Sequence, residues 1–271
     1  MQNHQNPAET LSHSRDIYVE RKGAVATIVL DRPQKHNAVT LEMWLQIPVI
    51  MNALSKDDSL RCVILRGAGE RAFSSGCDIS EFSEVRSNRE QGIIYGKAMQ
   101  DALLSLYECR HPLIAQVHGL CLGAGVELLA TCDIRICGES STFGIPAKNL
   151  GLVLSHAELK PLLELVGQDT LKEMLLEGRI FSAGEACFKK LVTRVVPDEA
   201  VEKETEASVR RITGGAPLAA RWHKKFVRRL AEDEPLSAEE YMEGFECYET
   251  QDYATGCAAF FKKEIPEFSG K

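Results

Sequence analysis

Apolar positions in the first half of the chain alternate between short β-branched runs and longer runs with helical spacing. The short runs predict buried strands at residues 24–30, 61–67, 112–117 and 133–137. Helical spacing follows the first two of them, over residues 41–54 and 92–109. Strands that alternate with helices favour an α/β structure with largely parallel strand pairing. Pro48 lies inside the first helical run, where a proline is expected to kink or divide a helix.

Helical patterns dominate the chain after about residue 155, where strand signals become rare. Ser182 and Glu185 have the spacing of a capping box, which closes the first turn of a helix with two reciprocal hydrogen bonds. Residues 216–230 and 237–261 are amphipathic, which is typical of core packing or of a face buried against another subunit. The predicted organisation is a flexible tail over residues 1–15, an α/β core over 16–200 and a helical region over 201–271.

Composition excludes several classes of protein. The apolar fraction of 44% and charged fraction of 26% are ordinary for a globular protein. A net charge of −7 argues against a nucleic-acid surface, and no apolar run approaches the roughly 20 residues that span a bilayer. Nine scattered cysteines without a C-x-x-C pair favour the reducing cytoplasm. His118 and Cys121 have a ligand-like gap but no matching second pair, so no metal site is expected.

Three glycines interrupt the segment HGLCLGAGVE at residues 118–127, between a β-branched run and a helical run. Their spacing fits neither a dinucleotide fingerprint, nor a P-loop, nor the elbow of a serine hydrolase. A turn that opens a helix leaves N–H groups unpaired, and glycine lets a ligand approach them closely. The segment therefore suits an oxygen that carries or develops negative charge, and Glu127 follows it directly.

A second segment, RAFSSGCDISEF at residues 71–82, also follows a predicted strand and carries Gly76 among small residues. If the ends of the two strands lie side by side, N–H groups from both turns can converge on one carbonyl oxygen. Alone, each segment is a weak signal, and an ordinary tight turn explains it better than a binding site does.

Six landmarks in order give the chain a family resemblance after the tail. They are IVLDRPQKHNAVT (28–40), RAFSSGCDI (71–79), PLIAQVHGLCLGAGVELLATCDIRI (112–136), STFGIPAKNLGL (141–152), RIFSAGEACFKKLVTRVVP (179–197) and TQDYATGCAAFFKKEIPEF near the end. With these the chain resembles the enoyl-CoA hydratase/isomerase, or crotonase, superfamily. The resemblance implies a spiral of ββα units, followed by a helical C-terminal region that assembles homotrimers or homohexamers.

The resemblance also implies an acyl-CoA thioester as substrate, with coenzyme A carried by the substrate and no permanently bound cofactor. It assigns the oxyanion hole to the main-chain N–H groups of Cys77 and Ala124. Glu127 matches a catalytic glutamate of the family and is expected to act as general base and acid. Its alternative role is that of an acid at a helix start, where it complements the dipole.

One position departs from the family pattern. Hydratases with two glutamates carry an acid after F-G-x-P, and this chain has Ala147 there. A methyl group transfers no proton, so addition of water by two carboxylates is in question. The neighbouring Lys148 is expected to face solvent or a phosphate. His156 is a candidate for the missing proton transfer and is equally consistent with a structural histidine.

Further acyl-CoA contacts follow from the same resemblance. Arg32, Lys35 and Lys262 are candidates for the phosphates of coenzyme A. The remaining candidates lie in the two glycine turns and are Ser75, Gly76, Asp78, Ile79 and Gly123. Among them, Asp78 is expected to hold its loop. Residues 83–92 are expected to form a mobile loop near the acyl pocket.

Three readings of the function remain open from the sequence. The first is hydration of a 2-enoyl-CoA to a 3-hydroxyacyl-CoA. The second is an enoyl-CoA double-bond isomerase that shuttles a proton with one glutamate. The third is an acyl-CoA-binding paralogue with weak catalysis.

Overall fold

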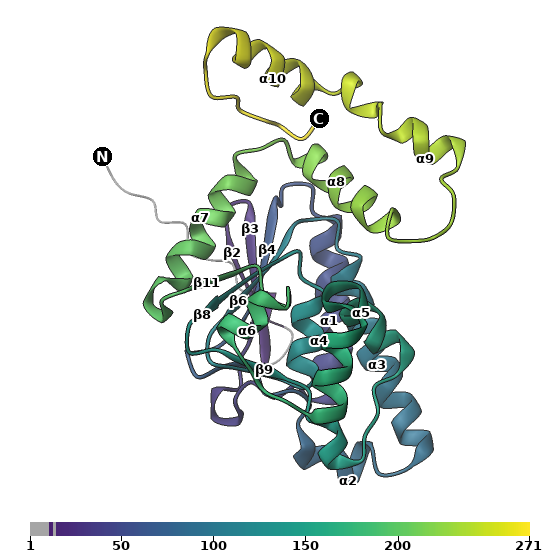
Figure 1. Cartoon of the computed structure of the whole chain (residues 1–271). Coiled ribbons are helices and arrows are strands. Elements are labelled where there is room, and N and C mark those ends of the chain that lie inside the picture. The colour runs from purple at the N-terminus through teal and green to yellow at the C-terminus, as the bar shows by residue number, and fades with distance from the viewer. Residues whose placement is uncertain (1–10, 13–14) are drawn as a thin grey trace.

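Two sheets organise the computed structural model, which describes residues 11–12 and 15–271 (Figure 1). The larger sheet has the strand order β1-β2-β3-β4-β6-β8-β11. Its strands are β1 (Leu11–Ser12), β2 (Ile17–Lys22), β3 (Val25–Leu30), β4 (Cys62–Gly67), β6 (Leu113–Val117), β8 (Ile134–Gly138) and β11 (Arg194–Val196). The smaller sheet has the order β10-β9-β7-β5, with β10 (Phe181–Ser182), β9 (Thr142–Gly144), β7 (Leu120–Leu122) and β5 (Ala72–Ser74).

The four strands predicted from apolar runs are confirmed as β3, β4, β6 and β8, each to within one or two residues at its ends. They pair in parallel with one another, as the alternation with helices indicated. Sequence analysis missed β2 and the short strands of the smaller sheet. The strands of the smaller sheet have only two or three residues, too few to show a period, so their pairing comes from tertiary contacts.

A ββα unit repeats along the core. The sequences β4–β5–α3, β6–β7–α4 and β8–β9–α5 each place one strand in the larger sheet, one in the smaller sheet and then a helix. The helices are α3 (Arg89–Tyr107), α4 (Ala124–Ala130) and α5 (His156–Lys172). Because β5, β7 and β9 run parallel, the turns that follow them lie at one edge of the smaller sheet.

Helix α1 (Leu41–Lys56) continues through Pro48, so of the two expected effects, a kink or a division, the division does not occur. Thr40 caps it by accepting a hydrogen bond from the Met43 N–H. Trp44 before the proline and Met51 after it are both fully buried in the same core. Burial of each large side chain contributes about 1.5–3 kcal/mol, which offsets the hydrogen bond that proline cannot make.

The expected loop over residues 83–92 is mostly helical, so that prediction is wrong. Helix α2 (Phe82–Val85) and the start of α3 occupy most of it. The Asn88 side chain caps α3 by accepting a hydrogen bond from the Gln91 N–H. The helix therefore begins at Arg89, three residues before the start that the apolar pattern indicated. Polar residues in a first helical turn have no apolar period, which is why the sequence resembled a loop.

Residues 201–271 are mainly helical, as predicted, with α7 (Val201–Thr213), α8 (Pro217–Arg229), α9 (Ala238–Glu243) and α10 (Gln251–Lys262), and α6 (Ala183–Phe188) precedes them. Ser182 and Glu185 form the predicted capping box of α6. Helices α9 and α10 project beyond the sheets (Figure 1). The predicted tail falls mostly outside the described residues, although the backbone of Leu11–Ser12 pairs with β2.

Gly125, the second residue of α4, tests how closely this helix packs on β5. A methyl group there would lie 2.5 Å from the Ser74 carbonyl oxygen, so we expect Gly125→Ala to lower the free energy of unfolding by about 1–3 kcal/mol. Gly184 is the second residue of α6 and would meet no described atom within 4 Å. As the matched control, Gly184→Ala should raise stability by about 0.4–1 kcal/mol. Denaturant unfolding measures both, and equal changes would contradict the close packing.

Candidate active site

Two turns meet at the edge of the smaller sheet, one after β5 and one after β7. Gly76 and Gly123 have φ angles of 99° and 53°, which favour glycine. A methyl group on Gly76 would lie 3.0 Å from the Leu122 carbonyl oxygen and 3.2 Å from the Ala124 nitrogen. The absence of side chains therefore allows the two turns to pack backbone against backbone.

Where these turns meet, two main-chain donors have no acceptor within the part of the chain that the structure describes. The Val39 N–H donates to the Gly76 carbonyl at 2.8 Å, and the Asp78 N–H donates to the Val39 carbonyl at 2.9 Å. Between them, the Cys77 N–H has no backbone acceptor among the described residues, nor does the Ala124 N–H at the start of α4. Both residues line a pocket of about 150 Å³. Unpaired N–H groups at such a position suit an oxygen with negative charge.

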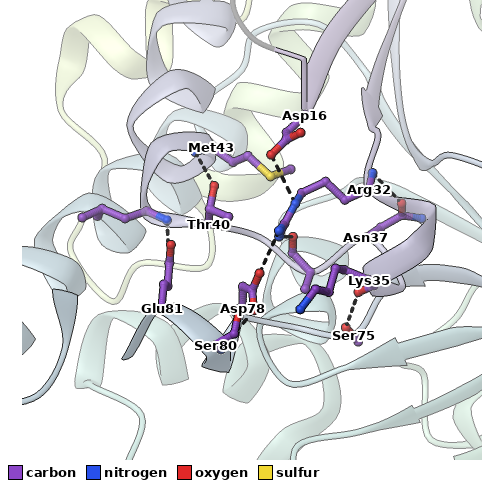
Figure 2. Close-up of polar contacts among 12 residues, drawn as sticks. Asp16, Arg32, Lys35, Asn37, Thr40, Met43, Ser75, Asp78, Ser80 and Glu81 are labelled. Atoms are coloured by element: carbon purple, nitrogen blue, oxygen red, sulfur yellow. Dashed lines mark hydrogen bonds and ion pairs between the residues drawn. The ribbon is translucent and has the colours of Figure 1, made fainter. Parts of the chain in front are cut away.

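An ion-pair network holds the first turn from behind (Figure 2). The Arg32 guanidinium donates to Asp78 at 2.8 Å and to the Ala38 carbonyl at 2.7 Å, and it lies 3.2 Å from the Asp16 carboxylate. Burial would raise the pKa of Asp78, but hydrogen bonds from Ser80 and Arg32 hold it below its usual value. Asp78 therefore braces its loop. Arg32 is engaged by this network, and its contact with a phosphate of coenzyme A stays a prediction.

The other two predicted phosphate contacts, Lys35 and Lys262, have exposed side chains outside the pocket lining. The backbone of Lys35 takes part in the network, because the Ser75 hydroxyl donates to its carbonyl at 3.3 Å (Figure 2). The Ser75 N–H donates to the His36 carbonyl at 2.9 Å. Contact of either lysine with coenzyme A stays a prediction.

Glu127 lies one turn into α4 and is only 5% exposed. It lines the same pocket as Cys77 and Ala124, and its Oε2 has no hydrogen-bond partner within the described chain. Burial raises the pKa of Glu127 well above its usual value. The neighbouring Glu158 raises it further through charge and a hydrogen bond, while Arg86 opposes them. Glu127 is thus suited to hold and to transfer a proton.

Glu158 is the site residue that sequence analysis missed. It lies in the first turn of α5, is 7% exposed and lines the pocket with Glu127. The Ser155 N–H donates to its Oε2 at 2.6 Å, and the Ser155 hydroxyl accepts from the Glu158 N–H. This S-x-x-E spacing was the only signal available, and a capping box accounts for it without any chemistry. Only the packing of α5 against α4 brings Glu158 into the site.

His156 is exposed and lies outside the pocket lining, so the structure does not place it where it was expected to transfer a proton. Residues two apart on a helix point about 200° away from each other, so Glu158 facing inward turns His156 outward. Ala147, in the 3₁₀ turn η3 (Ala147–Leu150), does line the pocket. Lys148 does not, and its stem lies against Gly178.

The remaining predicted contacts line the pocket together, namely Ser75, Gly76, Ile79 and Gly123. Apolar side chains form most of the other walls and include Phe82, Met99, Leu122, Ile145, Leu150, Leu152, Val153 and Leu154. The Arg86 guanidinium also lines it and lies 5.1 Å from the centre of the Phe82 ring. Such walls suit an acyl chain and strengthen the electrostatic effect of the two free N–H groups.

Residues 11–12 and 15–271 contain neither a cluster of metal-ligating side chains nor a helix suited to span a membrane. No cluster of three or more His, Cys, Asp or Glu side chains could hold a metal ion. Within the same residues, none of the helices has the length and apolar character needed to cross a membrane.

Comparison with known proteins gives concordant matches over nearly the whole chain. A family model described as enoyl-CoA hydratase/isomerase matches residues 20–271. The short-chain-enoyl-CoA hydratase of Clostridium acetobutylicum is 31% identical over 92% of this chain and 95% of that protein. A peroxisomal Δ(3,5)-Δ(2,4)-dienoyl-CoA isomerase of Arabidopsis thaliana is 30% identical over 82% and 85%. The crystal structure of an enoyl-CoA hydratase/carnithine racemase from Magnetospirillum magneticum has a TM-score of 0.93, with 43% identity over 95% and 97% of the two chains.

The raised pKa of Glu127 predicts a pH-dependent cost to stability. Above the unfolded value near 4.5, the folded state keeps a proton that the unfolded state releases, so stability falls as pH rises through this window. The glutamine side chain of Glu127→Gln is neutral at every pH. The free energy of unfolding of this variant should therefore equal that of the wild type at about pH 4 and exceed it at about pH 8. The expected gain is about 1.4 kcal/mol per unit of pKa shift, and urea unfolding at several pH values measures it. A gain that does not change with pH would contradict this electrostatic account.

Proposed function

The chain belongs to the enoyl-CoA hydratase/isomerase family, and from that premise we propose that it adds water to a 2-enoyl-CoA to give a 3-hydroxyacyl-CoA. The proposal rests on the arrangement of three groups in one pocket. The unpaired N–H groups of Cys77 and Ala124 and the buried carboxyl of Glu127 line one pocket with apolar walls. The named activity of the Clostridium relative, and of a crotonyl-CoA hydratase from Syntrophomonas wolfei at 29% identity, supports the same reaction.

The two N–H groups receive the thioester oxygen. Attack of water at C3 moves negative charge onto this oxygen, and the substrate becomes an enolate. A preorganised donor aimed at such charge contributes about 2.7–4 kcal/mol in a site that excludes water. Main-chain donors require no particular side chain, which is why a cysteine and an alanine can occupy these positions.

Glu127 takes part in the proton transfers of the addition. The attacking water loses a proton as its oxygen bonds to C3, and C2 gains a proton when the enolate collapses. A carboxyl group whose pKa is raised by burial can make such transfers at neutral pH. The thioester supplies the electron sink itself, so the reaction as proposed uses no metal and no permanently bound cofactor, and coenzyme A enters as part of the substrate.

Isomerisation of an enoyl-CoA double bond is the second candidate function. It is favoured by Ala147, whose methyl group stands in the pocket wall where two-glutamate hydratases of the family carry an acid. One carboxyl suffices to remove a proton from one carbon and return it to another. The Arabidopsis relative, a similar chain, is named for a related reaction, the isomerisation of a dienoyl-CoA.

Assembly into a homotrimer, or a homohexamer of two trimers, is part of the proposal. Helices α9 and α10 and the segment after them expose large apolar side chains, namely Tyr241, Phe245, Phe260, Phe261 and Ile265. Exposed apolar groups of this size favour burial against another subunit. The cytoplasm is the proposed compartment, supported by nine cysteines that are all free in the described chain.

The purified protein should convert crotonyl-CoA to 3-hydroxybutyryl-CoA, and Glu127→Gln should lower kcat/KM by about 100-fold or more. His156→Ala is the control and should stay within about twofold, because this exposed side chain lies outside the pocket. Mass spectrometry of the acyl-CoA products measures both.

The same assay separates the alternatives. Turnover of a 3-enoyl-CoA without turnover of crotonyl-CoA would replace hydration by isomerisation. Binding of CoA esters with no turnover of either substrate would contradict an enzymatic function and leave an acyl-CoA-binding protein.

A further inference from the structure

Two buried carboxyl groups face one pocket from different units of the fold. Glu127 comes from α4 and Glu158 from the first turn of α5, and both are more than nine-tenths buried. Both side chains line the same pocket, and the helices that carry them, α4 and α5, pack against each other. Burial, and then the charge of Glu158, raise the pKa of Glu127 well above its usual value, so Glu127 keeps a proton that it can give while the other carboxyl group can accept one.

The hydration reaction needs this state of protonation. One group must accept a proton from water, and another must give a proton to C2. A lone Glu127 has to do both in turn. A pair with one proton holds a base and an acid at the same time, and it still holds one proton after the reaction.

We propose that Glu158 is the second catalytic carboxyl group of this site, which accepts the proton of the attacking water while Glu127 protonates C2. This inference rests on the proposed hydratase function. It also explains why Ala147 need not abolish hydration, because the second carboxyl enters the pocket from α5 instead of from the turn after β9.

The oxygen of water bonds to C3 while Glu158 takes one of its protons, and the electrons of the double bond move to the thioester oxygen. That oxygen is held by the Cys77 and Ala124 N–H groups. The enolate then takes the proton of Glu127 at C2. Transfer of the proton from Glu158 to Glu127 within the pocket that both line restores the starting state.

The charged and titratable neighbours of the pair fit this assignment. Arg86, which follows α2, is the cation that acts on Glu127, so one negative charge on the pair has a counter-charge. The Cys77 thiol also faces the pair, and burial raises its pKa to about 12. Cys77 therefore stays neutral over the pH range of the assays, and a titration in that range belongs to the carboxyl pair.

Glu158 also closes the capping box of α5, so its structural role must be separated from a catalytic one. Glutamine serves in a capping box as well as glutamate, so Glu158→Gln keeps the cap and removes only the proton acceptor. Ser155→Ala does the reverse, because it removes the capping hydroxyl and leaves the bond from the Ser155 N–H to Glu158. Glu185→Gln makes the same chemical change in the exposed capping box of α6.

We expect Glu158→Gln to lower kcat/KM for crotonyl-CoA hydration by about 100-fold or more, and Ser155→Ala and Glu185→Gln to stay within about threefold of wild type. Exchange of the C2 protons of butyryl-CoA in D₂O uses only the oxyanion hole and Glu127. The exchange rate of Glu158→Gln should therefore stay within about tenfold of the wild-type rate, whereas Glu127→Gln should lose exchange.

The proposal is overturned if Glu158→Gln hydrates crotonyl-CoA at nearly the wild-type rate, if Ser155→Ala loses as much activity, or if Glu158→Gln loses hydration and exchange equally. If the variants do not fold, the pH dependence of kcat/KM of the wild-type protein still tests the proposal. A pair that must hold one proton gives kcat/KM an acid limb and an alkaline limb, and an acid limb alone overturns the proposal. If the wild type neither hydrates crotonyl-CoA nor exchanges butyryl-CoA protons, the proposed function itself has failed.

Discussion

Direct contact between two backbone turns is the constraint on which this site depends. Gly76 packs on Leu122, Gly123 and Ala124 with no side chain between them, which brings the starts of two separate loops into one place. Each turn is fixed from its other side. The first is hydrogen-bonded to Val39 and braced by the Arg32–Asp78 pair, and the second continues into α4, whose Gly125 packs on Ser74. The positions of the two N–H donors are therefore set by the scaffold and not by their own side chains.

The same packing determines the electrostatic environment of Glu127. Apolar walls and buried helices remove water from the neighbourhood of Glu127, which raises its pKa and leaves one of its oxygens without a partner in the described chain. A buried polar group in this state costs stability, and proteins retain such groups where they serve a function. Stability and chemistry are in opposition at this residue, because the burial that suits it to proton transfer also disfavours its ionised form.

Sequence reasoning predicted the parts of the structure that local pattern controls. The four apolar strands and the helical C-terminal region follow from local runs of residues. The clustering of Cys77, Ala124 and Glu127 in one pocket was expected from the family resemblance. It missed features decided by distant contacts. Pro48 remains inside a helix because the core holds both halves of α1, and Arg32 is bound by Asp78, 46 residues away. Glu158 went unrecognised because its local role as a cap is complete, and its second neighbour, Glu127, belongs to another unit.

The repeat of ββα units has a consequence for how such a protein can change. The pocket wall draws on the turns after β5, β7 and β9 and on the start of α5, so its chemical groups come from separate units on one framework. Ala147 and Glu158 stand in two neighbouring parts of that wall, and neither contributes to the contact that fixes the donors. A lineage of this architecture can gain, lose or relocate an acidic group by single substitutions while the machinery for the thioester oxygen is inherited unchanged.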